Sequence, residues 1–227
     1  LFLGEQDISE KWIGNLKGYK VVDGAMVTQK NAGNIYTKKS YQDYVFKFDF
    51  ALPPGGNNGL GLRTAHPDNK SVLKDVAYSS VELQILDNTH SDYKSLKPWQ
   101  YHASAYGLSA ATKDALKPVG EWNTQEVYLK GNHLIVRLND QIVQDVNLSE
   151  IEQSKSSDDK KILGGGRNRG VGHIAFAGHG ANVKFRNIYV AELDDDYTIP
   201  QVKDNVAPKG FTALFDGKSL QNWKGLL

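Results

Sequence analysis

A carboxylate and an amide stand two residues apart in a stretch that is typical of a β-strand. Glu82 and Gln84 alternate with the apolar Leu83 and Ile85. Because successive side chains of a strand leave opposite faces, we expect Glu82 and Gln84 to share the face that points away from the core. A carboxylate in that position can act as a general base or as a metal ligand. A solvated strand residue is the structural alternative.

Three further polar side chains are candidates for the same site. Asp87 ends the strand on the opposite parity and fits a turn as well as a site. Arg63 has the parity opposite to Leu60 and Leu62, so we expect it to face the same cleft as the carboxylate, with a surface ion pair as the alternative. His179 lies between two glycines.

Metal binding stays open at this stage. The chain has 6 His, but they form no His-Glu-x-x-His pair and show no other diagnostic ligand spacing. We therefore predict no certain cofactor, and we keep a divalent metal ion held by Glu82 and His179 as a hypothesis.

The segments that would position these residues alternate with a period of two, which indicates strands. Strand-like stretches occupy residues 44–51, 60–63, 80–86, 126–130, 133–138, 141–146, 171–177 and 183–192. Asn139-Asp140 fits the tight turn of a hairpin, because both residue types tolerate positive φ. Many strands at this spacing predict an all-β sandwich or jelly roll of two antiparallel sheets. The absence of long helices between the strands argues against a nucleotide-binding α/β fold.

Composition narrows the function classes. The chain has 227 residues, and its 27 basic and 26 acidic side chains give a net charge of +1, which argues against a nucleic-acid partner. No apolar run reaches the roughly 18 residues of a membrane helix. The absence of Cys excludes thiol nucleophiles, disulfides and thiolate metal sites. The first residues lack the pattern of a signal peptide, although a signal removed earlier would leave no trace.

The two ends of the chain resemble each other. Both the opening, Leu1 to Gly14, and the segment Leu214 to Gly225 read Leu-Phe-x-Gly, a polar stretch and then Trp-x-Gly. We predict one domain over residues 1–193, a polar linker over 194–209 and the start of a second, truncated copy over 210–227. Chance similarity between two aromatic segments is the alternative.

The segment from Phe211 to Gly225 closely resembles the opening of the bacterial 3-keto-disaccharide hydrolase family, once catalogued as a domain of unknown function. Further matching blocks follow one another in the same order between residues 1 and 193. They are Gly55 to Arg63, Val81 to Asp87, Ser104 to Leu108, Gly120 to Thr124, Gly172 to Phe176 and Phe185 to Ile188.

This resemblance implies a concanavalin A-like jelly roll with a concave cleft, similar to laminarinase-type glycoside hydrolases. Such hydrolases place two carboxylates at i and i+4 of one strand, with an acid between them. The matching positions here are Glu82, Gln84 and Leu86, so one carboxylate remains. Ordinary double displacement needs two carboxylates, which counts against that mechanism for this strand.

Cleavage of a 3-keto sugar requires fewer catalytic groups than ordinary glycoside hydrolysis, because the ketone acidifies the hydrogen at C2. One base and one stabiliser of the enolate then suffice to expel the C1 substituent, and water can add afterwards. The resemblance thus suggests Glu82 as the base and Arg63 as the enolate stabiliser. Many family members read Gln-Asp-His-Gly where this chain has Ala177-Gly178-His179-Gly180, so His179 stays a candidate without an adjacent carboxylate.

A sugar substrate gives a role to the aromatic residues between positions 87 and 119. Trp99, Tyr101 and Tyr106 are candidates to stack on sugar faces, with packing inside the loop as the alternative. Together with Gln84 and Asp87 they form the predicted substrate-binding set.

The leading hypothesis is therefore an enzyme that cleaves 3-keto glycosides as a hydrolase or lyase. A lectin-like module that binds carbohydrate without cleaving it is the first alternative, and a structural spacer is the second. The family suggests a periplasmic, secreted or cell-surface protein. The expected partners are a carbohydrate and the second repeat of the same chain.

Overall fold

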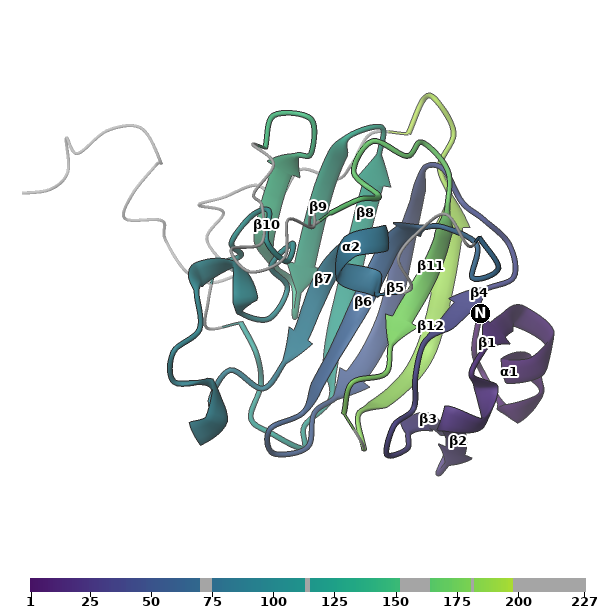
Figure 1. The fold of residues 1–227 in the computed structure, drawn as a ribbon, viewed down its shortest axis with the longest axis vertical. Helices are drawn as coiled ribbons and strands as arrows, with labels where there is room; N and C mark the ends of the chain where they lie inside the picture. Colours follow the sequence, from purple (N-terminus) through teal and green to yellow (C-terminus); the bar gives the residue numbers. More distant parts are fainter. Residues whose placement is uncertain (70–74, 113–114, 152–163, 181, 198–227) are drawn as a thin grey trace, which may run out of the picture. The chain divides into compact units, whose positions relative to one another are not determined.

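The computed structural model describes residues 1–69, 75–112, 115–151, 164–180 and 182–197. In these residues twelve strands form two antiparallel sheets, and the helices are short (Figure 1). The five-stranded sheet has the order β1 (Trp12–Gly14), β4 (Ile35–Thr37), β11 (His173–Ala177), β6 (Asn57–Thr64), β7 (Val81–Leu86). The seven-stranded sheet has the order β10 (Gln141–Asn147), β9 (His133–Leu138), β8 (Asn123–Lys130), β5 (Tyr44–Ala51), β12 (Lys184–Glu192), β3 (Ala25–Thr28), β2 (Tyr19–Val22). The α-helices are α1 (Glu5–Lys11) and α2 (Val76–Ser79), and 3-10 helices cover Leu16–Gly18, Ser91–Tyr93 and Pro98–Gln100.

The core lies between the two sheets and is rich in aromatic side chains. Four aromatic residues of β5 are fully buried, as their alternation predicts: Tyr44, Phe46, Phe48 and Phe50. Phe176 on β11 meets Phe185 on β12 across the sandwich, with ring centroids 4.2 Å apart. Pairs of this kind add about 0.5–1.5 kcal/mol to the energy of burial. The prediction of a sandwich of two antiparallel sheets is confirmed.

The turns follow the local chemistry of the sequence. The β5 strand ends at Ala51, immediately before the turn cluster that begins with Leu52 and Pro53. Asn139 and Asp140 adopt positive φ angles of 46° and 69° and join β9 to β10, as their residue types predict.

The outer face of the five-stranded sheet carries a patch of very small residues. On β6, Gly61 lies opposite Glu82 and Gly59 lies opposite Gln84. On the other side of β6, Ala175 and Ala177 of β11 pair with the same two glycines. Because side chains alternate along each strand, these four small residues form a low floor beside the polar side chains of β7.

Residues 103–106 pair with the free edge of β7 through backbone hydrogen bonds and so extend this sheet. Leu83 and Ala105 form an antiparallel bridge. The Gln84 amide donates to the Ser104 carbonyl at 2.9 Å, and the Tyr106 amide donates to the Glu82 carbonyl at 2.8 Å. The helix α2 lies over β6 and β7 on the same outer face (Figure 1).

Residues 1–195 form one compact unit. The predicted second copy at residues 210–227 and most of the predicted linker at 194–209 lie outside the described residues. None of the helices in the described part of the chain has the length and apolar character needed to cross a membrane.

Candidate active site

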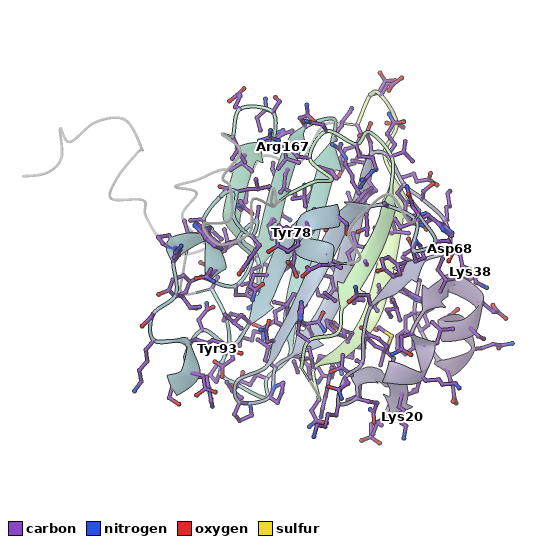
Figure 2. The ribbon with its side chains drawn as sticks, viewed as in Figure 1. Lys20, Lys38, Asp68, Tyr78, Tyr93 and Arg167 are labelled. Atoms are coloured by element: carbon purple, nitrogen blue, oxygen red, sulfur yellow. The ribbon has the colours of Figure 1, made fainter. Side chains whose placement is uncertain are left out.

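A cavity of about 200 Å³ lies over the small-residue floor of the five-stranded sheet. Its lining comes from β6, α2, β7, the paired segment beyond β7 and the loop after β11. The lining residues are Asn57, Asp75, Ala77, Tyr78, Glu82, Gln84, Tyr106 and His179. Figure 2 shows Tyr78 on α2, in front of the sheet. We call this cavity the Glu82 pocket.

Glu82 is the buried acid of this pocket. Its side chain leaves the outer face of β7, while Leu83 and Ile85 enter the core, as the alternation of the strand predicts. The Glu82 side chain is only 4% exposed, and its carboxylate lies directly over Gly59. Burial raises the pKa of Glu82 because desolvation disfavours the charged form, while the nearby imidazole of His179 partly opposes this effect.

The imidazole of His179, which is positively charged when protonated, lies next to the carboxylate of Glu82. Its Nε2 lies 3.8 Å from Oε1 of Glu82, and half of the side chain remains exposed. Contact with the Glu82 carboxylate raises the pKa of His179, although partial burial acts in the opposite direction. Backbone hydrogen bonds fix the neighbouring glycines: Gly178 donates to Gly33 at 3.1 Å and Gly180 donates to Asn57 at 3.0 Å.

Two amides line the pocket beside the acid. Nε2 of Gln84 donates to Oδ1 of Asn57 at 3.2 Å, and Gln84 is 7% exposed. A primary amide has two N–H donors and one carbonyl acceptor, so this pair retains hydrogen-bonding capacity for a bound hydroxyl or carbonyl group.

Of the three aromatic residues predicted to stack on sugar, Tyr106 is the one that lines the pocket. Trp99 packs against the Tyr106 ring edge-to-face, with centroids 4.9 Å apart, and does not line the pocket itself. Tyr101 is partly exposed on the same segment and falls outside the pocket lining.

Asp75 and Tyr78 belong to the pocket but were missed by reasoning from the sequence. Asp75 caps α2, because its Oδ1 accepts a hydrogen bond from the Ala77 amide at 2.9 Å. Its charge also contributes to the raised pKa values of both Glu82 and His179. An Asp before an apolar pair is a helix-start signal, but a four-residue helix is too short to show a periodicity.

The expectation that Arg63 shares the cleft with Glu82 was wrong. The Arg63 guanidinium donates to the Gly131 carbonyl and to Oδ1 of Asn132 at 3.3 Å, and it lines a separate cavity that also includes Asp43. Arg63 has a positive φ of 53°, and the pairing of β6 with β11 shifts register at this point. Strict alternation ends at such an irregularity, so parity did not predict the direction of the side chain.

Asp87 acts as a turn residue, the structural option of the two left open. Its carboxylate accepts hydrogen bonds from the Gly55 amide at 2.9 Å and from the amide and hydroxyl of Thr89 at 3.0 and 2.6 Å. Partial burial alone would raise the pKa of Asp87, but these hydrogen bonds outweigh it and lower the pKa. Asp87 lines a different cavity, so it does not join Glu82.

The candidate metal ligands Glu82 and His179 lie close together, but a third ligand is missing from the part of the chain that the structure describes. There, no three His, Asp, Glu or Cys side chains gather in a geometry that could hold an ion. A divalent ion at this site therefore stays a hypothesis.

The fold and the pocket define the class of protein: an antiparallel β-sandwich domain with a buried acid and an imidazole over one sheet. The chain belongs to the family described as the 3-keto-alpha-glucoside-1,2-lyase-like domain, whose model matches residues 1–191. This membership confirms the family and the carbohydrate-active enzyme class predicted from the sequence.

Individual relatives agree with this assignment. The chain is 28% identical over 214 residues to a 3-keto-disaccharide hydrolase of Bacteroides thetaiotaomicron. The match covers 84% of this chain and 73% of the relative. A putative glycosyl hydrolase of Parabacteroides distasonis is 25% identical, with a TM-score of 0.69 over 81% of this chain and 94% of that one. A protein of Bacillus subtilis with a galectin-like fold, 12% identical, has a TM-score of 0.54 over 84% of this chain and 93% of that one, which shows the fold alone.

Proposed function

We propose that this domain cleaves glycosides whose sugar carries a ketone at C3, by elimination across C1 and C2. The observation that carries the proposal is the buried carboxylate of Glu82, with a raised pKa, beside the imidazole of His179 in one pocket. A general base works best when its pKa lies near the working pH, and burial moves Glu82 in that direction. The name of the family supports elimination, and the name of the Bacteroides relative supports a disaccharide substrate.

In this mechanism Glu82 removes the proton from C2, and the electron pair of that bond forms the enolate of the C3 ketone. The enolate then collapses to a C1–C2 double bond as the C1–O bond breaks. His179, when protonated, donates a hydrogen bond to the enolate oxygen, which is the role that the sequence suggested for Arg63. Gln84 and Asn57 hold the sugar through their amides. Later addition of water to the enone would give the products of hydrolysis.

The size of the pocket supports a small reacting unit. Pockets for drug-sized ligands range from about 300 to 1,000 Å³, whereas the Glu82 pocket has about 200 Å³. We infer that it holds one oxidised sugar ring, with the leaving group directed toward solvent.

An assay on paired substrates tests the proposed function. The purified protein is incubated with a set of 3-keto-glucosides and with their unoxidised parents, with EDTA and with added divalent ions. We expect cleavage of the keto forms alone, and exchange of a C2 deuterium label into solvent. EDTA sensitivity would support a bound ion. Cleavage of the parents would contradict the proposal, and sugar binding without any cleavage would favour the lectin-like alternative.

The pH dependence of activity tests the assigned roles of the acid and the imidazole. Glu82 must be ionised, so kcat/KM should rise with pH through its raised pKa. His179 must be protonated, so kcat/KM should fall as pH passes its raised pKa. In His179→Gln the positive charge that lowers the pKa of Glu82 is gone. We therefore expect the acid limb to move to higher pH and the fall in kcat/KM that belongs to His179 to disappear.

A matched control exists on the other sheet. His133 pairs with Asp145 at 2.6 Å on β9 and β10, outside the pocket, and both side chains are exposed. The His133→Gln variant should keep the wild-type pH profile. An unchanged profile for His179→Gln would remove His179 from the mechanism.

A further inference from the structure

Tyr106 lies opposite Glu82 in the extended sheet. The bridge between Leu83 and Ala105 fixes the register, so the next residues outward, Glu82 and Tyr106, face each other. Leu83 and Ala105 are both fully buried in the core. Since side chains alternate along both segments, Tyr106 and Glu82 project from the outer face together, with Cβ atoms at roughly 4.5–5.5 Å as in other cross-strand pairs.

The hydroxyl of Tyr106 is oriented by its neighbours. Nε2 of Gln100 donates to the Tyr106 hydroxyl at 3.2 Å, and Trp99 supports the ring edge-to-face. A phenol has one O–H proton to donate in addition to its acceptor capacity. Gln100 uses a lone pair of the Tyr106 hydroxyl oxygen and not its proton. Since Tyr106 lines the Glu82 pocket, the hydroxyl can donate that proton to a group bound there.

The mechanism proposed above assigns no residue to protonate the glycosidic oxygen as it leaves. Breaking the C1–O bond releases the glycosidic oxygen as an alkoxide unless it takes a proton. Among the other pocket residues, His179 is paired with Glu82 and Asp75 caps α2. The pocket has a second phenol, Tyr78 on α2, but Tyr106 is the one that backbone pairing places opposite Glu82. A phenol is a far stronger acid than a sugar alcohol, so Tyr106 is chemically suited to this task.

We propose that Tyr106 is the general acid that protonates the glycosidic oxygen as it leaves C1. This inference rests on the proposed function. The C2 proton goes to Glu82, the electron pair forms the C1–C2 double bond by way of the enolate, and the leaving oxygen takes the proton of Tyr106. The resulting phenolate regains a proton from solvent, and Glu82 gives its proton to solvent. The net change converts the glycoside into an enone and an alcohol.

The test compares two leaving groups on the same oxidised sugar. A 4-nitrophenyl 3-keto-glucoside releases a stable phenolate and does not need an acid, whereas a methyl 3-keto-glucoside releases a methoxide and does. For Tyr106→Phe we expect kcat/KM to fall at least about 100-fold on the methyl glycoside, the range of general acid catalysis. On the nitrophenyl glycoside it should change by no more than a few fold.

The controls separate this inference from the proposed function. Tyr189→Phe, on an exposed tyrosine of β12 in the other sheet, should match the wild type on both substrates. Phenylalanine keeps the ring of Tyr106, and a thermal melt checks that the fold is intact. Equal losses on both glycosides, or no loss on either, would overturn the inference alone. A wild-type protein inactive on both would overturn the proposed function and the inference together.

Discussion

Replacing Glu82 with glutamine is expected to lower kcat on a 3-keto-glucoside by at least about 100-fold, since general base catalysis contributes roughly 10²–10⁴. The glutamine side chain has nearly the same shape as that of glutamate, so the substitution removes the base without creating a cavity beneath α2. The unfolding midpoint should not decrease, because burial already disfavours the charged form of Glu82 and a neutral amide avoids that cost. Binding of the unoxidised parent sugar, measured by calorimetry, should change little.

The matched control is Glu192→Gln. This carboxylate is exposed at the end of β12, where it pairs with Lys39 outside the pocket. Surface pairs of this kind contribute at most about 1 kcal/mol, so its activity and stability should match the wild type. If Glu82→Gln kept wild-type turnover, the carboxylate would not be the base.

The second large effect is expected from Gly59→Ala. A Cβ built at Gly59 would lie 1.8 Å from Oε1 of Glu82 and 2.7 Å from its Cδ, so the carboxylate would have to move. A displacement of about 1 Å at a reacting group can cost on the order of 100-fold in rate. We therefore expect a loss of activity near that of Glu82→Gln, together with destabilisation of about 1–3 kcal/mol from overpacking.

The double variant Gly59→Ala/Glu82→Gln separates the two effects. If Gly59 acts by seating the carboxylate, the double variant should have no less activity than Glu82→Gln alone. Gly170→Ala serves as the control, because nothing lies within 4 Å of a Cβ at that position. Losses that multiply in the double variant would show that the glycine acts elsewhere.

Local patterns predicted much of the fold and the centre of the site. The alternation of β5 predicted its buried aromatic face, and the same period placed Glu82 and Gln84 on the outer face of β7. Both predictions depend only on neighbouring residues within one strand. The approach of His179 to Glu82 needs the pairing of β11 with β6, so the sequence supplied the two residue types but not their distance of 3.8 Å.

The errors and omissions have physical causes. Arg63 was misplaced because its positive φ breaks the alternation on which the prediction relied. Asp75 and Tyr78 were missed because a four-residue helix has no measurable period. Gly59 gave a sequence signal only as part of a glycine-rich strand, and its role appears only once the carboxylate of Glu82 is seen above it.

The backbone pairing of residues 103–106 with β7 makes the position of Tyr106 independent of the length of the loop that precedes it. Residues 88–102 begin and end beside the same strand, so insertions or deletions between these points need not shift Tyr106 relative to Glu82. Surface loops anchored in this way accept changes in length at small thermodynamic cost. Trp99 and Gln100 contact Tyr106 and would have to keep their places, so we expect changes in length to be tolerated in the part of the loop that precedes Lys97.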